Sequence, residues 1–458
     1  MYFNPILSTD SYKTTHYKQY PPGTEKIYSY YESRGGLYKE TVFFGLQYIM
    51  HYLPCFTQEE DIAFAQEFLK HHFGADHLNR SGWEYLATQY PDALPLHIKA
   101  VPEGTVVPTH NVLMTVENTD PKCYWLTNFV ETLLCHTWYP TTVATVSREI
   151  KKTFLKALKQ TGDPSTIDFK LHDFGMRGAT CVEAAAIAGA AHLVNFKGTD
   201  TLPAIEFLNK YYTSDPMKMY GFSVPASEHS TMTSWGREHE VDAYRNMLDS
   251  YPDSTVSVVS DSYDVFAACR DIWGGDLKEQ VQKHKGTLVV RPDSGPPVET
   301  LKQVFHELGQ AFGWSENDKG YRVLPSNVRV LWGDGIDHAA VKKIISALKR
   351  EHISLDNLAF GMGAGLVQRL DRDTQKMAFK CSWAQINREG REVYKDPVTA
   401  SGKMSKRGRL KLVLDDNGNY CTVPESDPRP DQLVTVYDPK HGSLNSCDFA
   451  EVRERAKV

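Results

Sequence analysis

The sequence predicts an α/β fold in which a (β/α) barrel-like domain is joined to an antiparallel α+β domain built from both chain ends. From about residue 165 to 370, the chain repeats a short apolar strand, a polar or glycine-rich loop and an amphipathic helix. This alternation is typical of βα units around a parallel sheet. The stretches before and after it are rich in strands, with the Pro and Gly punctuation of antiparallel meanders.

Strand-like stretches recur along the middle of the chain, and a plausible helix follows each one. They span residues 168–175, 191–200, 221–229, 255–264, 287–295, 328–335 and 358–365. In parallel barrels the catalytic groups lie at the carboxyl ends of the strands, where the loops lead into the helices. We therefore expect the chemistry in the loops that follow these stretches.

The two chain ends differ from the middle. The segment 96–120 alternates apolar and polar residues, and DNGN at 416–419 is a turn signal between two strands. We predict that residues 1–160 and 375–458 form one α+β domain and that residues 161–374 form the barrel domain.

The composition is that of an ordinary globular protein. Its 458 residues exceed the usual size of one domain, which favours two. The formal net charge of −6 is too small to attract nucleic acid or a membrane in bulk, and the basic cluster at 403–411 fits a solvated surface. The eight cysteines are widely spaced without a CxxC pair, and neither a signal-peptide pattern nor a long apolar stretch is present. These features predict a cytoplasmic protein with reduced thiols.

Polar side chains recur where the predicted strands run into loops. They are His172, Asp173, Arg177, Asp200, Glu228, His229, Asp261, Asp264, Arg291, Asp293, Asp334 and Asp337. Any one of them fits a helix cap or a solvated loop as well as a catalytic role, since Asp and Ser are favoured N-cap residues. Their recurrence in consecutive units is the observation that indicates a site.

Three loops with glycines indicate a phosphate site in the late units. RPDSG at 291–295 follows a strand and precedes a helix, and GDG at 333–335 and GMGAG at 361–365 follow in the next two units. Glycine lets the backbone approach a phosphate closely, although the same glycines also suit tight turns. Barrels often build a phosphate site from their late βα loops.

The loops also supply oxygen ligands of the kind that Mg²⁺ prefers. These are Glu228, Asp261, Asp264 and Asp293. A phosphorylated sugar with magnesium is therefore the expected ligand. Phe174, close to Arg177, suits stacking against a flat ring as well as a place in the core. His229, at the start of a predicted helix, suits either phosphate chemistry or a structural role.

A series of long motifs resembles, in the same order, the nicotinamide phosphoribosyltransferase family. The motifs are STDSYKTTHYKQYPPGTEKIYSYYESRG, AVPEGTVVP, NTDPKCYWLTNFVETLL, KLHDFGMRG, HLVNFKGTDT, SVPASEHSTMTSWG, SVVSDSYD, VVRPDSG, GDG, FGMGAGLVQRLDRD and YKDPV. The resemblance covers residues 6 to 455, approximately. It implies a type II phosphoribosyltransferase fold, with an α/β barrel beside an antiparallel α+β domain, in a homodimer with active sites at the interface.

The resemblance also implies a reaction. Nicotinamide and 5-phosphoribosyl 1-pyrophosphate would give nicotinamide mononucleotide and pyrophosphate, the salvage step toward NAD. In this family Mg²⁺ assists, and ATP hydrolysis improves the reaction through transient phosphorylation of a histidine, which the motif places at His229.

The resemblance assigns roles to several of the candidate residues. Phe174 and Tyr12 of the partner subunit would sandwich the nicotinamide ring. Arg177 would contact the side of the ring or the carboxamide, and Asp200 would accept a hydrogen bond from the carboxamide. A nicotinate carboxylate would meet the like charge of Asp200, so the amide should be preferred.

The phosphoribosyl group has a second set of implied contacts. Around ribose, pyrophosphate and magnesium these are Ser260, Asp264, Arg291 and Asp293, with Glu228, Asp264 and Asp293 as metal ligands and His229, Asp264 and Asp293 as catalytic residues. Near ribose and the 5′-phosphate they are Gly333, Asp334, Gly363 and Ala364. The partner subunit would supply the phosphate and pyrophosphate clamp of Arg34, Arg372, Lys380, Lys395 and Lys403.

Two residues depart from the family pattern. Met176 stands where vertebrate members have Tyr, which should alter the wall beside the ring. Ala364 stands where those members have Gly, and a positive φ there would strain Ala and weaken phosphate binding. The loop after Arg34 also looks short, which affects its reach across a dimer interface.

Two other functions remain open. A nicotinate phosphoribosyltransferase shares the fold and mechanism, but its site should offer a cation or a neutral donor at the position of Asp200. A non-catalytic binding or signalling member of the family is the other alternative. The joint presence of His229, Asp264, Arg291 and Asp293 argues against it.

Overall fold

The computed structural model describes residues 4–53, 58–396, 405–443 and 446–458. The chain forms two compact units. The terminal unit contains residues 1–145, 211–213 and 371–457, and the barrel unit contains residues 146–210, 214–370 and 458. The boundaries predicted from the sequence, after residues 160 and 374, lie C-terminal to these divisions. The first division falls within the long helix α6 (Trp138–Thr161).

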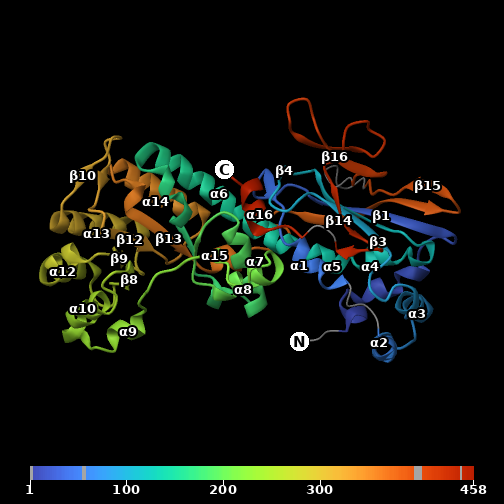
Figure 1. Ribbon diagram of the computed structural model, residues 1–458, viewed down its shortest axis with the longest axis horizontal. Coiled ribbons are helices and arrows are strands. Elements are labelled where there is room, and N and C mark those ends of the chain that lie inside the picture. The colour runs from blue at the N-terminus through green and yellow to red at the C-terminus, as the bar shows by residue number, and fades with distance from the viewer. Residues whose placement is uncertain (1–3, 54–57, 397–404, 444–445) are drawn as a thin grey trace. The chain divides into compact units, whose positions relative to one another are not determined.

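The barrel unit contains a parallel sheet with the strand order β7-β6-β13-β12-β9-β8 (Figure 1). Every neighbouring pair in this sheet is parallel. Its strands are β6 (Leu171–Asp173), β7 (Gly198–Thr199), β8 (Val256–Val259), β9 (Leu288–Arg291), β12 (Val328–Trp332) and β13 (Leu358–Met362). The predicted α/β class and parallel sheet are therefore confirmed.

The segment 222–226 connects the two edges of this sheet. Phe222 forms a parallel bridge with Gly198 beside β7, and Ala226 forms one with Ser257 of β8. The backbone N–H of Ser257 donates to the carbonyl of Pro225 at 2.9 Å. In place of the strand predicted at 221–229, the structure has two bridges that close the ring of barrel strands. Pro225 has no N–H to donate, which limits strand pairing in this segment.

Helices connect the barrel strands and pack around them, and Figure 1 shows α10, α12, α13 and α14 gathered around β8, β9 and β12. Their bounds are α7 (Val182–Leu193), α8 (Leu202–Tyr211), α9 (His229–Thr233), α10 (Glu240–Ser250), α11 (Val265–Ala267), α12 (Lys278–Lys283), α13 (Pro297–Phe312), α14 (His338–Arg350) and α15 (Ala364–Val367). A π-helix, η8 (Ala268–Asp276), follows α11, and a small hairpin joins β10 (Ser315–Glu316) to β11 (Arg322–Val323).

The core of the barrel unit comes from its strands. Val256, Val258, Leu288 and Val290 have side chains with no exposed surface.

One predicted strand was too long. The stretch 191–200 is helical up to residue 193, because the preceding alanine-rich run favours a helix. Only its last residues form β7.

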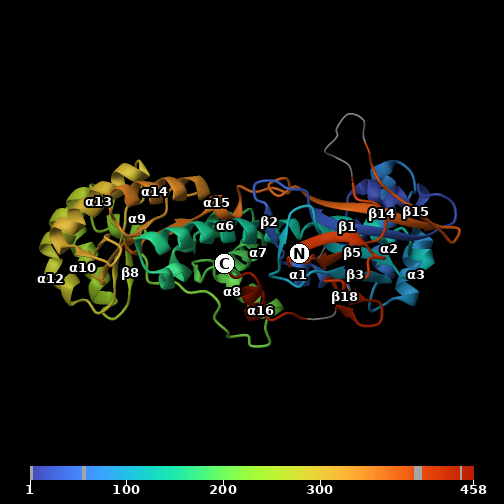
Figure 2. The same ribbon diagram turned by 90° about the horizontal axis from the view of Figure 1, so that it is seen from above.

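The terminal unit contains an antiparallel sheet with the order β15-β14-β1-β5-β3-β18-β19 (Figure 2). Its strands are β1 (Thr24–Ser33), β3 (Leu96–Ala100), β5 (Val112–Asn118), β14 (Met377–Ile386), β15 (Glu389–Glu392), β18 (Val434–Asp438) and β19 (Gly442–Ser443). Strand β1 pairs with β14 on one side and β5 on the other. Both chain ends therefore build one sheet, as predicted.

Two further hairpin-like pairs and several helices complete the terminal unit. The pairs are β2 (Glu40–Val42) with β4 (Val106–Pro108) and β16 (Leu410–Leu414) with β17 (Tyr420–Pro424). Gly418, at φ +78°, adopts the left-handed conformation in the predicted turn between β16 and β17. The helices are α1 (Leu46–Met50), α2 (Glu59–Phe73), α3 (Arg80–Gln89), α4 (Leu126–Phe129), α5 (Glu131–Cys135) and α16 (Phe449–Arg455), with the 3-10 helix η2 (Ser11–Lys18) near the start.

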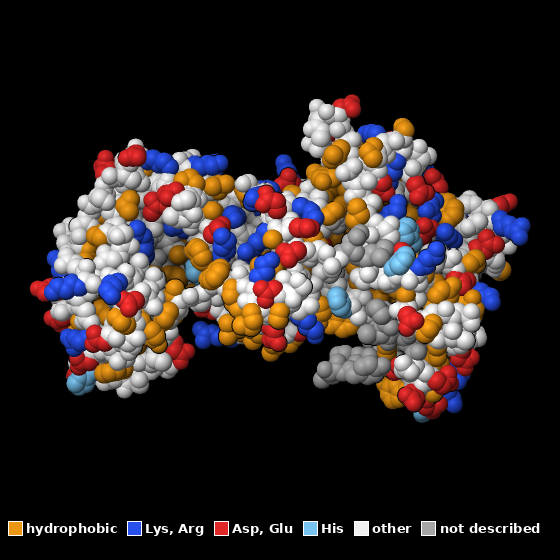
Figure 3. Space-filling model, in the orientation of Figure 1, with side chains coloured by type: hydrophobic (Ala, Val, Ile, Leu, Met, Phe, Trp, Pro, Cys, Tyr) orange, Lys and Arg blue, Asp and Glu red, His pale blue; other side chains and the backbone are white. Residues whose placement is uncertain are grey.

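The surface and the thiols agree with the composition. Figure 3 shows Lys and Arg side chains interspersed with Asp and Glu on the face in view. The seven cysteines that the structure describes are free thiols. Within the described ranges, no helix combines the length and apolar character that crossing a membrane requires.

Candidate active site

Phe174 lies directly after β6, across glycines that end two neighbouring strands. Its backbone N–H donates to the carbonyl of Met362 at 3.0 Å. A Cβ added at Gly361 would lie 2.0 Å from Cε2 of Phe174, and one added at Gly333 would lie 3.6 Å from it. Gly361 of GMGAG therefore makes room for this ring, whereas a Cβ at Gly333 would only be in ordinary contact with it. The sequence could not indicate the contact between Gly361 and Phe174. The half-buried ring is consistent with a stacking surface.

Asp200 follows β7 with an exposed carboxylate. The hydroxyl of Ser223, from the bridging segment, donates to its Oδ1. The backbone N–H of Asp200 donates to the carbonyl of Asp173 at 3.0 Å, so the loop that carries it is tied to the end of β6. Ser223 was not predicted from the sequence, since a serine in a loop has no distinctive pattern.

Arg177 lies in a 3-10 turn, η6 (Met176–Gly178), and its side chain is exposed. This turn packs against the start of α15, because a Cβ at Gly178 would lie 3.3 Å from the backbone nitrogen of Ala364. Met176 is half-buried in the same turn. One short loop after β6 thus carries both Phe174 and Arg177.

His229 forms a hydrogen-bonded chain with two loop residues. Its Nε2 lies 3.0 Å from Oδ1 of Asp261, and Oδ2 of Asp261 accepts the hydroxyl of Ser294. The His229 side chain is 49% exposed, whereas that of Asp261 is only 5% exposed. A buried carboxylate that holds an accessible imidazole is the arrangement that orients a histidine for nucleophilic or acid–base work.

Asp293 lies within the electrostatic range of four other loop residues. Burial raises the pKa of its carboxyl, and the carboxylates of Asp261 and Asp334 raise it further, while Arg291 and His229 lower it. Nε of Arg291 lies 3.8 Å from Oδ1 of Asp293. The structure therefore brings the loops after β8, β9 and β12 together around one group of charges, as the barrel prediction requires.

Three other predicted residues point elsewhere or act as caps. Ser260 has no exposed surface, and its hydroxyl donates to the carbonyl of Val258 at 2.9 Å. Asp264 caps α11 by accepting the N–H groups of Phe266 and Ala267, each at 3.0 Å. Glu228 caps α9, and its carboxylate accepts the hydroxyl of Ser230.

The predicted magnesium ligands do not gather into one closed metal site. Within the described part of the chain, no three His, Cys, Asp or Glu side chains gather as a metal-binding group. Glu228, Asp264 and Asp293 therefore do not form a closed site. Mg²⁺ commonly keeps several waters and takes only one or two protein carboxylates together with substrate phosphates. The oxygen-only set around Asp293 and Asp261 fits that chemistry.

The late glycine loops carry the remaining barrel residues. Asp334 is exposed, and its backbone carbonyl accepts Nε1–H of Trp332 at 2.7 Å. Gly363 precedes α15, and Ala364 is the first residue of that helix. Ala364 is not among the described residues with positive φ, so the condition under which Ala would be strained at this position is not met.

The terminal unit groups three of the predicted phosphate-clamp cations. Burial lowers the pKa of Lys380, and the positive charges of Arg34 and Arg372 lower it further, against the opposing charge of Glu131. Nε of Arg34 donates to Oε1 of Glu32 at 3.0 Å, but its buried Nη2 has no hydrogen-bond partner. A group of neighbouring cations, one of which has a guanidinium nitrogen without a hydrogen-bond partner, is suited to binding an anion.

Tyr12, Lys395 and Lys403 remain predictions. Tyr12 is 55% exposed in η2, where its ring meets His16 edge-on at 4.8 Å. The backbone N–H of Lys395 donates to Oγ of Ser405 at 2.9 Å. Lys403 lies outside the described residues.

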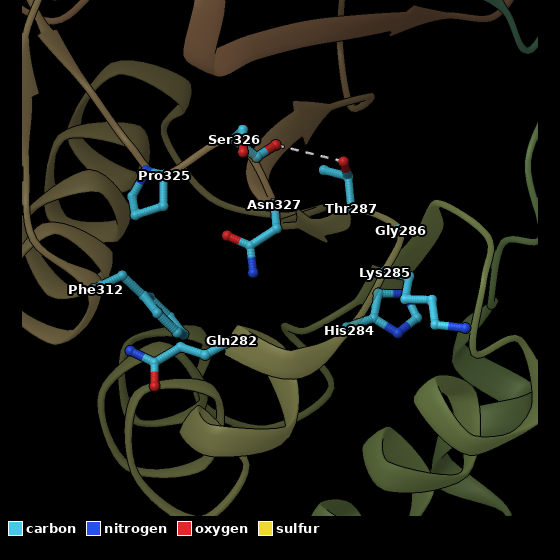
Figure 4. A pocket seen from close by; sticks show the side chains of 9 residues that line it. All are labelled: Gln282, His284, Lys285, Gly286, Thr287, Phe312, Pro325, Ser326 and Asn327. Atoms are coloured by element: carbon cyan, nitrogen blue, oxygen red, sulfur yellow. Dashed lines mark hydrogen bonds between the residues drawn. The ribbon is translucent and has the colours of Figure 1, made fainter.

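A cavity of about 500 Å³ lies at the other end of the barrel strands. Figure 4 shows its lining residues, Gln282, His284, Lys285, Gly286, Thr287, Phe312, Pro325, Ser326 and Asn327. Thr287 and Asn327 precede β9 and β12, whereas Arg291 and Gly333 lie at the ends of these strands or just beyond. This cavity is therefore separate from the candidate site, and no predicted site residue lines it.

The chain resembles solved structures over nearly its whole length. Nicotinate-nucleotide pyrophosphorylase from Pyrococcus furiosus matches with a TM-score of 0.62 and 16% identity, over 99% of this chain and 94% of that one. Human nicotinic acid phosphoribosyltransferase matches with a TM-score of 0.56 and 15% identity, over 98% of this chain and 93% of that one. At these identities the likeness shows a shared fold.

Sequence comparisons show the family. Residues 169–439 match the model of the nicotinate phosphoribosyltransferase family, and residues 4–98 match that of the nicotinamide phosphoribosyltransferase N-terminal domain. A nicotinamide phosphoribosyltransferase from Xanthomonas campestris pv. campestris is 47% identical over 95% of this chain and 94% of its own length. One from Acinetobacter baylyi is 32% identical over 99% of this chain and 97% of its own length. The chain therefore belongs to the nicotinate phosphoribosyltransferase family and groups within it with the nicotinamide phosphoribosyltransferases.

Proposed function

We propose that this protein transfers the phosphoribosyl group of 5-phosphoribosyl 1-pyrophosphate to nicotinamide. The products are nicotinamide mononucleotide and pyrophosphate, in a salvage step toward NAD that takes place in the cytoplasm. The names of the curated relatives support the reaction. The observation that carries the choice of base is the carboxylate of Asp200, exposed at the end of β7.

The base site uses the residues that surround Phe174. The pyridine ring stacks on Phe174 and on Tyr12 of the partner subunit, and such stacking adds about 0.5–1.5 kcal/mol beyond the burial of area. Arg177 contacts the ring side, and Asp200 accepts a hydrogen bond from the carboxamide NH₂. Nicotinate is disfavoured because its carboxylate would face the like charge of Asp200.

The transfer step requires positioning and charge neutralisation. The bond between C1 of the ribose and pyrophosphate breaks, pyrophosphate leaves with the electron pair, and the ring nitrogen of nicotinamide donates its lone pair to C1. Asp293 and Arg291 hold the ribose and pyrophosphate, together with Asp264 in the preceding loop. Ser260, whose hydroxyl is buried, supports that loop from below through its bond to Val258. The backbone at Gly333, Asp334, Gly363 and Ala364 receives the 5′-phosphate. Preorganised charges of this kind stabilise an oxocarbenium-like transition state.

Magnesium and a second subunit complete the proposed site. Mg²⁺, held by Asp293 with Asp261 or the loop carboxylates Glu228 and Asp264, would neutralise charge on the leaving pyrophosphate. The partner subunit of a homodimer supplies the phosphate clamp. Its members are Arg34, Arg372, Lys380, Lys395 and Lys403. The unsatisfied Nη2 of Arg34 and the crowding of Lys380 by two arginines support this role.

ATP acts as a coupled co-substrate through His229. The bond from Nε2 to Asp261 fixes the imidazole and leaves the other ring nitrogen to take the γ-phosphoryl group of ATP, with ADP as the leaving group. Hydrolysis of the phosphohistidine then returns the free imidazole. The exposure of the ring permits ATP to reach it.

The test is product formation by the purified protein with 5-phosphoribosyl 1-pyrophosphate and Mg²⁺. Nicotinamide is compared with nicotinate, each with and without ATP. We expect nicotinamide mononucleotide as the preferred product and a faster reaction with ATP. Preference for nicotinate would leave the family reaction intact and overturn the role of Asp200. Ligand binding without product from either base would favour a binding or signalling protein.

A further inference from the structure

A buried carboxyl beneath the base site has no role in the function proposed above. Asp173 is the last residue of β6 and has no exposed surface. Its Oδ1 accepts the N–H of Gly175 at 2.7 Å, and its Oδ2 accepts the hydroxyl of Thr199 at 3.3 Å. One carboxyl therefore connects the loop after β6 with the end of β7.

Both oxygens of this carboxyl are closely enclosed. A Cβ at Gly175 would lie 2.9 Å from Oδ1, and a Cβ at Gly189 of α7 would lie 2.9 Å from Oδ2. Real Cβ atoms do not approach so closely, so glycine at these two positions lets the backbone close over the group. Burial raises the pKa of Asp173, and the nearby charge of Asp200 raises it further, while hydrogen bonds oppose the shift. Such a group is costly to bury unless its hydrogen bonds are made.

The partners of Asp173 belong to the two loops that recognise the base. Gly175 lies between Phe174 and Arg177, and Thr199 directly precedes Asp200. The backbone carbonyl of Asp173 also accepts the N–H of Asp200 at 3.0 Å. The side chain and the main chain of one residue thus hold both loops.

Thr199 extends this connection around Asp200. Its Oγ1 accepts the N–H of Thr201 at 3.0 Å while its hydroxyl donates to Asp173. The turn that presents the Asp200 carboxylate is therefore fixed on both sides. Loss of the Asp173 carboxyl would leave the N–H of Gly175 buried without an acceptor, and would free the Thr199 hydroxyl.

We propose that Asp173 is a positioning residue for the base, whose carboxyl fixes the separation between Phe174 under the ring and Asp200 at the carboxamide. This inference rests on the proposed function, which assigns those two contacts. Positioning of this kind has a large effect, since a misplacement of about 1 Å can cost on the order of a hundredfold in rate.

Two substitutions separate the hydrogen bonds from the charge. Asp173→Ala removes both bonds and leaves the N–H of Gly175 buried without an acceptor. From the cost of such an unsatisfied donor, we expect the KM for nicotinamide to rise roughly tenfold. The preference for nicotinamide over nicotinate should fall, while the KM for 5-phosphoribosyl 1-pyrophosphate stays within about twofold. Asp173→Asn should restore most of the loss, because its amide oxygen can accept from Gly175 and its NH₂ can donate to Thr199.

A substitution in the partner tests the same connection without touching Asp173. Thr199→Val removes one of the two bonds and should raise the KM for nicotinamide by a smaller factor. In the double variant, Thr199→Val should cost less than it does in the wild type, because the contact shared with Asp173 is already gone and only the bond from the N–H of Thr201 is lost in addition. If Asp173→Ala fails to fold, Thr199→Val and Asp173→Asn still decide the question.

Asp356→Ala is the matched control. The Asp356 carboxyl also joins a backbone N–H, that of Asp163 at 2.9 Å, to a hydroxyl, that of Ser354 at 3.1 Å, but it precedes β13 at the opposite end of the sheet. We expect both KM values and the base preference to stay unchanged in this variant. An unchanged KM in Asp173→Ala, or equal rises for base and phosphoribosyl donor, would overturn the proposal. No rescue by Asp173→Asn would also overturn it.

Failure of the proposed function is detected separately. The wild-type protein first shows which base it uses, and the variants are then assayed with that base. If the wild type uses nicotinate, the assignment of Asp200 fails, but a selective rise in the KM for nicotinate in Asp173→Ala would still support Asp173 as a positioning residue. An absence of wild-type turnover would be answered by equilibrium binding of nicotinamide to the same variants.

Discussion

At the residue scale, the proposed choice of base depends on one carboxylate. Asp200 offers an acceptor to a carboxamide and a like charge to a carboxylate. We expect Asp200→Ser to reduce the preference for nicotinamide over nicotinate by at least tenfold, the factor that corresponds to about 1.4 kcal/mol. The ratio of the two kcat/KM values measures this preference.

Ser223→Ala is the control for that substitution. It removes the hydroxyl that donates to Asp200 but keeps the carboxylate and its charge. The preference should then stay close to that of the wild type. A ratio unaltered in Asp200→Ser would remove Asp200 from the account of specificity.

A second prediction at this scale concerns the coupling to ATP. His229→Ala should abolish the enhancement by ATP and leave a slow basal transfer, because the role proposed for the imidazole is to accept a phosphoryl group and not to break the bond at C1. Asp261→Asn should weaken the enhancement, since an amide orients the imidazole less strongly than a carboxylate. Rates with and without ATP measure both effects. Full coupling in His229→Ala would contradict the assigned role.

At the element scale, the ends of β12 and β13 lie against Phe174, the residue proposed to stack on the base. Gly361→Ala places a methyl group only 2.0 Å from Cε2 of Phe174, so the ring must move. We expect the displaced ring to raise the KM for nicotinamide by about tenfold, with smaller effects on 5-phosphoribosyl 1-pyrophosphate. Steady-state kinetics with each substrate varied in turn provide the measurement.

Gly275→Ala, in η8, is the matched glycine substitution. A Cβ there would meet only the carbonyl oxygen of Arg270, at an ordinary 3.6 Å. It should leave both KM values unchanged. Equal kinetics in Gly361→Ala and Gly275→Ala would show that the contact with Phe174 does not position the ring for binding.

The elements also show what the sequence could and could not predict. The βα units were recognisable because buried parallel strands are short apolar runs and polar residues cluster in the loops that follow. Periodicity carries no information about contacts between distant residues, so the pairs Gly361–Phe174 and Asp261–His229 were not predicted. Asp173 was noted as one loop carboxyl among many, and only its buried hydrogen bonds distinguish it.

At the scale of the whole molecule, the chain ends and the middle supply different parts of the proposed chemistry. The barrel unit carries the residues proposed for ribose and for ATP and most of those proposed for the base, while the terminal unit carries Tyr12 and the proposed phosphate clamp. Each group is assembled within its own unit, by the parallel strand ends in one and by β1 and β14 in the other. If one subunit of a homodimer completes the site of the other, combining two differently defective subunits tests the arrangement.

Two inactive variants should restore activity to each other when their subunits exchange. Arg372→Ala is defective in the terminal unit and Asp293→Asn in the barrel unit. In a mixed dimer one site combines both defects, while the other combines two intact parts, so random exchange should recover about one quarter of the wild-type activity. Refolding the variants together, with each refolded alone as the control, gives the measurement. Activity no higher than the mean of the separate variants would mean that each subunit builds its site from its own residues.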